Sequence, residues 1–184
     1  MIYIHTFYFN PFRECTYIVT KEEQDEHPHQ CLIIDPGCYD EKEEKRLLEY
    51  LIAHHLTPEA VLITHAHPDH VCGLEFIQKC FPGIRVTGYG SQVTEDEKWG
   101  YKVLFTPGHK EDCVCYYFEQ EGILFSGDTL FQEGIGRTDL PGGDMQELLR
   151  TLALLKQLPK QTVVYPGHGY TTTIEHEIQF NPYL

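Results

Sequence analysis

Short apolar runs dominate the first third of the chain and predict β-strands. Three are rich in aromatic and β-branched residues, at Ile2 to Phe9, Cys15 to Thr20 and Cys31 to Ile34. The run between the last two, Lys21 to Gln30, is strongly polar, which predicts a solvated hairpin loop with His27 and His29 facing water. The chain therefore begins as a sheet.

Two later segments have the apolar spacing of amphipathic helices behind an acidic N-cap. Asp40 with Glu43, and Asp144 with Glu147, form capping boxes. The apolar faces that follow contain Leu47, Leu48, Leu51, Ile52 and His55 in the first helix, and Met145, Leu148, Leu149, Leu152 and Leu155 in the second. A shorter helix is predicted by Leu74, Ile77 and Phe81, before Pro82-Gly83 stops it.

Strands and helices alternate in both halves of the chain, which decides the expected fold class. The further strands are Val61 to Thr64, Ile84 to Gly88, Lys102 to Phe105, Val114 to Phe118, Ile123 to Phe125 and Thr162 to Tyr165. This alternation predicts an α/β fold with two mixed β-sheets packed together and helices on the outer faces, a four-layer α/β/β/α sandwich. At 184 residues we expect one domain over residues 1–184.

Charge and cysteine content narrow the function classes. Fourteen basic and 28 acidic residues give 14 − 28 = −14, a field that repels nucleic acid and anionic membranes. The N-terminus lacks the pattern of a secretion signal, and the seven cysteines lack paired metal-ligand spacing. We therefore expect a cytoplasmic protein that binds neither nucleic acid nor membranes, with most cysteines as buried small side chains. Cys113 and Cys115 would lie on one strand face, where a redox or metal role is the alternative.

A cluster of histidines and an aspartate follows the predicted strand at Val61 to Thr64. The segment His65-Ala-His67-Pro-Asp69-His70 places four potential metal ligands within six residues. An alternative is a polar loop in which Asp69 caps a helix and the histidines face water. Three further residues, each just after a predicted strand, favour a metal site: His109, Asp128 and His168.

With these residues in order, the sequence resembles the metallo-β-lactamase superfamily. The family motif T-H-x-H-x-D-H is present from Thr64 to His70. The resemblance implies two divalent metal ions, zinc or else iron or manganese. One would be held by His65, His67 and His109, the other by Asp69, His70 and His168, with Asp128 bridging them.

Within the superfamily, Phe125-Ser-Gly-Asp-Thr-Leu-Phe131 and Val164-Tyr-Pro-Gly-His-Gly169 are similar to the short glyoxalase II-type hydrolases. The resemblance implies hydrolysis of an acyl thioester, such as S-lactoylglutathione, by a metal-bridging hydroxide, with Asp69 orienting it. A mononuclear-iron persulfide dioxygenase is the alternative. β-Lactamase action is disfavoured because one large zinc branch has a cysteine where Asp128 stands, and nuclease action is disfavoured by the charge.

Residues around the ligands are expected to support them. Asp35 matches the superfamily's aspartate after an early strand, where it would accept a hydrogen bond from a ligand histidine, although a turn-forming Asp-Pro-Gly is the other interpretation. Thr64 is either such a support or strand filler. Arg137 is expected to pair with Asp139 and shape the loop beside the bridging aspartate.

Two departures from the family pattern concern the substrate. The family usually continues Thr-Pro-Gly after the histidine at position 109, but here Lys110-Glu-Asp-Cys113 follows. Lys110 is a candidate contact for an anionic substrate, unless Glu111 and Asp112 neutralise it. Only 109 − 70 = 39 positions separate His70 from His109, fewer than relatives commonly have, which predicts an open site.

Overall fold

A computed structural model describes residues 1–21, 29–88, 90 and 94–184 of the chain. His27 lies outside the described residues. The chain forms two compact units, Met1–Thr87 and Gly88–Leu184, and each is described by itself. The expectation of one domain over residues 1–184 stays a prediction. Among the described residues, no helix has the length and apolar character needed to cross a membrane.

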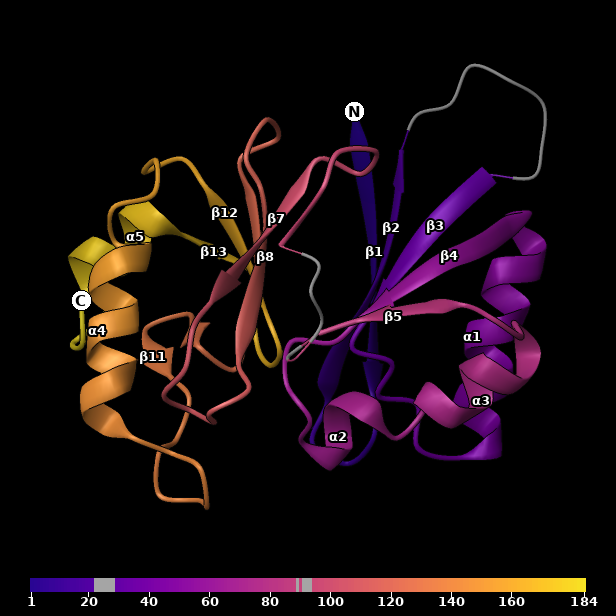
Figure 1. Ribbon diagram of the computed structural model, residues 1–184, viewed down its shortest axis with the longest axis horizontal. Coiled ribbons are helices and arrows are strands. Elements are labelled where there is room, and N and C mark those ends of the chain that lie inside the picture. Colours follow the sequence, from indigo (N-terminus) through magenta and orange to yellow (C-terminus); the bar gives the residue numbers. More distant parts are fainter. Residues whose placement is uncertain (22–28, 89, 91–93) are drawn as a thin grey trace. The chain divides into compact units, whose positions relative to one another are not determined.

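The first unit is a five-stranded mixed sheet with helices beside it (Figure 1). Its strands are, in sheet order, β1 (Ile2–Phe9), β2 (Glu14–Lys21), β3 (His29–Ile34), β4 (Leu56–Leu62) and β5 (Arg85–Thr87). The first three pair antiparallel, whereas β3, β4 and β5 pair parallel. Lys21, His29 and Gln30, which the sequence analysis placed in a hairpin loop, belong to these paired strands.

The helices of this unit are α1 (Glu41–Ala53), α2 (Pro68–Val71) and α3 (Leu74–Cys80). As predicted, Asp40 caps α1, and its side chain accepts a hydrogen bond from the Glu43 backbone N–H at 2.9 Å. Leu47 and Leu51 are buried in a core that strands and helices share. Ile52 is exposed, and His55 lies beyond the helix end with a left-handed φ of 52°, so both were wrongly placed on the buried face.

The second unit is a six-stranded sheet with a small two-stranded ribbon. In sheet order its strands are β13 (Thr172–Thr173), β12 (Val163–Pro166), β9 (Ile123–Gly127), β8 (Val114–Phe118), β7 (Tyr101–Phe105) and β6 (Glu95–Asp96). Strands β10 (Leu130–Phe131) and β11 (Gly134–Ile135) form the ribbon. Strands β9 and β12 pair parallel and the other neighbours antiparallel, so this sheet is also mixed.

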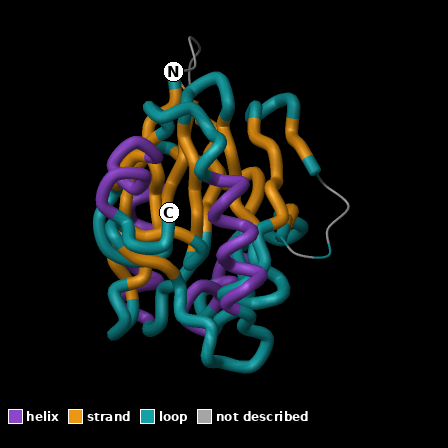
Figure 2. The backbone as a smooth tube through the Cα atoms, turned by 90° about the vertical axis from the view of Figure 1, so that its left-hand side faces the viewer, coloured by secondary structure: helices purple, strands orange, loops and turns teal. Residues whose placement is uncertain are grey.

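Two helices, α4 (Met145–Leu155) and α5 (Ile174–Phe180), pack on this sheet and lie over its strands in Figure 2. The predicted cap of α4 is confirmed: Asp144 accepts hydrogen bonds from the backbone of Gln146 and Glu147 at 2.8 and 3.0 Å. Leu148, Leu152 and Leu155 are buried as expected. Met145 and Leu149 are exposed, so the buried face of this helix is narrower than predicted.

Candidate metal centre

In the first unit, the histidine-rich turn begins where β4 leaves the sheet. The backbone of Ile63 still bonds Thr87 at 2.8 Å, so the turn starts from a fixed position. Pro68 occupies the first turn of α2, where its missing N–H is not needed. His65 Nε2 and His67 Nδ1 face each other at 2.9 Å. These two nitrogens can therefore face one cation.

Asp35 organises the second part of the turn. It has a left-handed φ of 47° and a backbone bond to Leu62 at 2.9 Å, which fixes it at the end of β3. Its Oδ1 accepts the Thr64 backbone N–H at 2.7 Å, and its Oδ2 accepts the Thr64 hydroxyl at 2.6 Å. The same Oδ2 lies 3.0 Å from His70 Nδ1. The expected hydrogen bond to a candidate ligand histidine is thus present.

These bonds also indicate which ring nitrogens carry a proton and which carry a lone pair. Because Asp35 can only accept, His70 carries its proton on Nδ1, and its Nε2 keeps a lone pair. Thr64 gives its one proton to Asp35 and so accepts from His65 Nδ1 at 3.1 Å. His65 Nε2 is then a lone-pair donor as well. His70 Nε2 lies 3.9 Å from Asp69 Oδ2, which places a carboxylate beside it.

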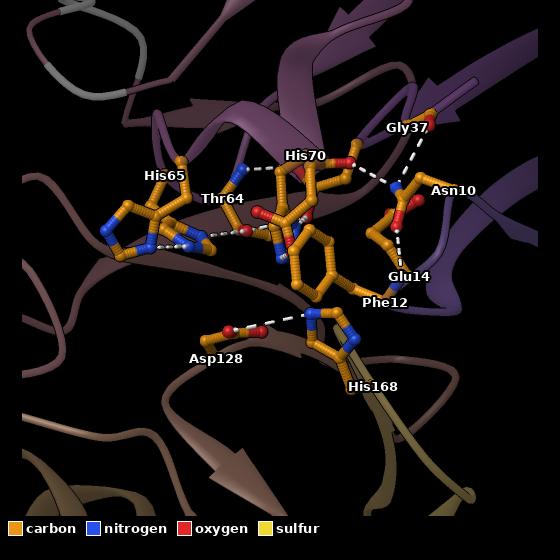
Figure 3. Close-up of polar contacts among 12 residues, drawn as sticks. Asn10, Phe12, Glu14, Gly37, Thr64, His65, His70, Asp128 and His168 are labelled. Atoms are coloured by element: carbon orange, nitrogen blue, oxygen red, sulfur yellow. Dashed lines mark hydrogen bonds and ion pairs between the residues drawn. The ribbon is translucent and has the colours of Figure 1, made fainter. Parts of the chain in front are cut away.

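Two residues beneath the turn carry contacts that the sequence analysis missed. Asn10, in the turn between β1 and β2, donates from Nδ2 to the carbonyl of Gly37 at 3.1 Å (Figure 3). It also donates to the carbonyl of Asp69 at 2.9 Å. Glu14 is fully buried, and burial raises the pKa of its carboxyl well above the usual value, with the nearby His70 opposing the shift. A Cβ on residue 37 would lie 2.0 Å from Glu14 Oε2, so the close packing there requires glycine.

In the second unit, three candidate ligands lie together at the ends of strands. Asp128 and His168 follow the parallel neighbours β9 and β12, whose carboxyl ends lie at the same edge of the sheet. Asp128 Oδ2 is 3.7 Å from His168 Nε2 and 3.6 Å from His109 Nε2. Figure 3 shows the first of these pairs. One carboxylate oxygen therefore lies between two imidazole nitrogens.

Arg137 supports this group through its backbone. His109 Nδ1 donates to the Arg137 carbonyl at 2.6 Å, which leaves His109 Nε2 as a lone-pair donor. The Arg137 side chain makes the expected ion pair with Asp139, at 2.7 Å in both of its hydrogen bonds. The guanidinium lowers the pKa of Asp139 to about 2. A Cβ at Gly136 would meet the Asp128 carbonyl at 1.9 Å, so only glycine permits this approach.

The donor set in each unit fits a divalent metal ion. Metal–ligand bonds of about 2.0–2.2 Å place neighbouring ligand atoms about 3.0–3.6 Å apart at angles between about 90° and 110°. The separations of 2.9, 3.6, 3.7 and 3.9 Å described above lie close to this range. Imidazole nitrogens and carboxylates suit zinc, iron and manganese. The donors therefore match the metals that the sequence predicts.

Lys110, the candidate contact for an anionic substrate, pairs with a neighbouring carboxylate. Its ammonium group lies 2.6 Å from Asp112 Oδ2, and the side chains of both residues are mostly buried. Of the two acidic neighbours that the sequence offered as neutralising partners, Asp112 is the one in contact. A substrate contact by Lys110 stays a prediction, and this ion pair competes with it.

The Metallo-beta-lactamase superfamily matches residues 15–90 and 81–168 of the sequence, which together make up most of the chain. The chain belongs to this superfamily. The probable metallo-hydrolase YqgX from Bacillus subtilis (strain 168) is 35% identical to the chain, and the match covers 84% of the chain and 87% of that protein. The superfamily's hydroxyacylglutathione hydrolase from Legionella pneumophila (strain Paris) is 35% identical over 73% of the chain, but the match spans only 57% of that protein.

Solved superfamily structures are also similar over nearly the whole chain. BLEG-1, a B3 metallo-beta-lactamase, has a TM-score of 0.88 at 29% identity, covering 99% of both chains. TTHA1623, in a di-iron-bound form, has a TM-score of 0.81 at 31% identity, covering 98% and 100%. ETHE1 from Myxococcus xanthus has 0.80 at 29% identity, covering 98% and 83%. The expected metallo-β-lactamase fold is thereby confirmed, and the chain is an enzyme of a family that uses divalent metals.

Proposed function

We propose that the chain is a two-metal hydrolase that cleaves acyl thioesters, as glyoxalase II-type enzymes do. One metal is assigned to His65, His67 and His109, and the other to Asp69, His70 and His168. Asp128 would be a ligand to both. The assignment rests on the family motif and on the donor geometry inside each unit. The observation that carries it is the pair of contacts from Asp128 Oδ2 to two imidazole nitrogens, His109 Nε2 and His168 Nε2.

The chain's own residues prepare this site. Asp35 holds a proton at His70 Nδ1, and the Arg137 carbonyl holds one at His109 Nδ1, so each ring offers Nε2 without reorganisation. Asp69, about one-fifth exposed beside His70, accepts a hydrogen bond from the attacking water and orients it. Bound metals would lower the pKa of that water toward about 7 and polarise the substrate carbonyl.

Thioesters suit this set of residues because of the leaving group. A thiol has a pKa of about 8.5, so it departs as a thiolate without a dedicated acid. Similarity to the hydroxyacylglutathione hydrolase from Legionella supports a thioester such as S-lactoylglutathione. The net charge of −14 and the pairing of Lys110 with Asp112 offer little attraction for the carboxylates of glutathione. The proposal therefore includes thioesters of thiols other than glutathione.

A mononuclear-iron persulfide dioxygenase is the second candidate, supported by the similarity to ETHE1. The deciding experiment supplies the purified protein with zinc, iron or manganese and measures thiol release from thioesters alongside oxygen uptake with a persulfide. Because BLEG-1 is also similar, one β-lactam belongs in the panel. Thiol release that a chelator abolishes supports the proposal. Oxygen uptake or β-lactam cleavage with no thiol release contradicts it.

A further inference from the structure

An apolar pocket lies beside Asp69 within the first unit. Its volume is about 200 Å³, and Pro11, Phe12, Tyr39 and Pro68 form most of its wall. Phe12 and Tyr39 are 72% and 67% exposed. Large apolar side chains gathered around a pocket in this way are typical of a binding surface.

Hydrogen bonds hold the pocket open in the folded protein. Glu43 accepts the backbone N–H of Asn10 at 3.0 Å and that of Tyr39 at 2.9 Å. It therefore ties the turn that carries Phe12 to the loop that carries Tyr39. Asn10 in turn bonds the carbonyl of Asp69 at 2.9 Å. The backbone segments that carry the two aromatic side chains are thus tied to the backbone of Asp69, so substrate binding does not have to bring these segments together.

The charge and size of the pocket restrict its occupant. Asp69 is the acidic residue of its lining, and the lining contains no Lys, Arg or His. With no cationic partner in the described lining, a carboxylate would bind poorly there, whereas an uncharged apolar group fits. Cavities of about 150 Å³ lined by apolar side chains bind benzene. A pocket of about 200 Å³ accepts a phenyl ring or a chain of about six carbon atoms.

We propose that this pocket is the subsite for the acyl group of the substrate, and that the enzyme prefers thioesters of uncharged, apolar acids of about six to eight carbon atoms. The proposal rests on the proposed thioester hydrolysis. Asp69 lines the pocket and would orient the attacking water, so the carbonyl carbon must lie next to it. The acyl chain, which is bonded to that carbon, then extends between the side chains of Phe12 and Tyr39.

The test uses thioesters of one uncharged thiol, N-acetylcysteamine, with acetyl, butanoyl, hexanoyl and phenylacetyl groups. We expect kcat/KM to rise at least about tenfold from acetyl to phenylacetyl, as apolar pockets discriminate by size. Phe12→Ala and Tyr39→Ala should each reduce this ratio to within about threefold. Tyr3→Ala is the matched control, because Tyr3 is an exposed aromatic residue on the adjoining β1 and does not line the pocket. It should leave the ratio unchanged.

A second series keeps the acetyl group and enlarges the thiol. If the gain with size follows the thiol instead of the acyl group, the proposal is wrong. It is also wrong if Tyr3→Ala and Tyr39→Ala change the ratio equally.

A binding measurement separates the subsite from the reaction. Uncharged 4-fluorotoluene, followed by fluorine NMR, should bind the wild-type protein, and Tyr39→Ala should weaken binding at least about fivefold, with Tyr3→Ala as control. If no thioester is hydrolysed but the probe binds in this Tyr39-dependent way, the proposed function fails and the apolar subsite stands. If thioesters are hydrolysed without acyl preference and the probe does not bind, the subsite fails alone.

Discussion

Replacing Asp35 by asparagine tests the support of the histidine turn. Asparagine tolerates the left-handed backbone at this position, so the change acts through the side chain. The asparagine oxygen must take the place of Asp35 Oδ1, which accepts the Thr64 backbone N–H at 2.7 Å. In the opposite orientation, the NH2 group would face this N–H, and both groups are donors. The NH2 group then faces His70 Nδ1, 3.0 Å away. His70 must move its proton to Nε2, the nitrogen assigned to the metal.

The size of the effect follows from these contacts. Removing the carboxylate charge from the buried hydrogen bonds with Thr64 and His70 costs about 1–3 kcal/mol of unfolding free energy, which urea unfolding of the metal-free protein measures. Loss of a supporting carboxylate weakens metal binding about 10–100-fold, or about 1.4–2.7 kcal/mol, which competition with a chromophoric chelator measures. Asp139→Asn is the matched control, because its carboxylate is exposed and pairs with Arg137. Unchanged metal affinity in Asp35→Asn would refute the reasoning.

Three further changes test other parts of the site. Asp128→Ala should abolish activity and lower the bound metal while circular dichroism stays native, because it removes the oxygen between His109 and His168; full metal content would contradict this role. Lys110→Ala should raise KM less than about threefold at low salt, since Asp112 already occupies the ammonium group; a tenfold rise that shrinks with salt would restore Lys110 as a substrate contact. Burial raises the pKa of Cys72 to about 11. Because only the thiolate reacts with maleimide, the labelling rate of Cys72 should rise about tenfold per pH unit from pH 7 to 9. A plateau in this rate below pH 9 would contradict the raised pKa.

The ligand-bearing turns could be found from the sequence because each is local. His65 to His70 follow one buried strand, and the three later candidates each follow another, so short motifs indicate them. Asp35 could also be identified, because the strand and the Asp-Pro-Gly turn after it lie in one short segment of the sequence. Only one of the two contacts of Arg137 could be predicted. Its ion pair could be predicted from the spacing, but the bond from its carbonyl to His109 could not.

Asn10 and Glu14 were missed for a physical reason. Asn10 bonds the carbonyl of Asp69, 59 positions away, and nothing in the turn around it indicates that partner. Glu14 begins an apolar strand, where a glutamate usually faces water, yet it is buried beside the Asp35–His70 pair. Contacts of this kind depend on the packing of a whole sheet. Apolar periodicity carries no information about them.

Short elements were missed as well. Strands β6, β10, β11 and β13 have two residues each, too few for any alternation to show. Helix α5 was missed although Thr173 accepts the His176 backbone N–H at 3.1 Å, a cap that the sequence could have indicated. Its buried Glu177 interrupts the apolar pattern. That carboxylate is held by the Glu133 backbone and the Asn181 amide, both at 2.8 Å.

Metal stoichiometry tests the central claim most directly. Seven candidate ligand groups exceed what one four-coordinate ion can use, so the protein should bind two metal ions per chain. Elemental analysis of protein equilibrated with excess zinc, iron or manganese and then freed of unbound metal measures this number. The account predicts two ions per chain, with activity rising as the second binds. Saturation at one ion per chain, with full activity, would contradict it.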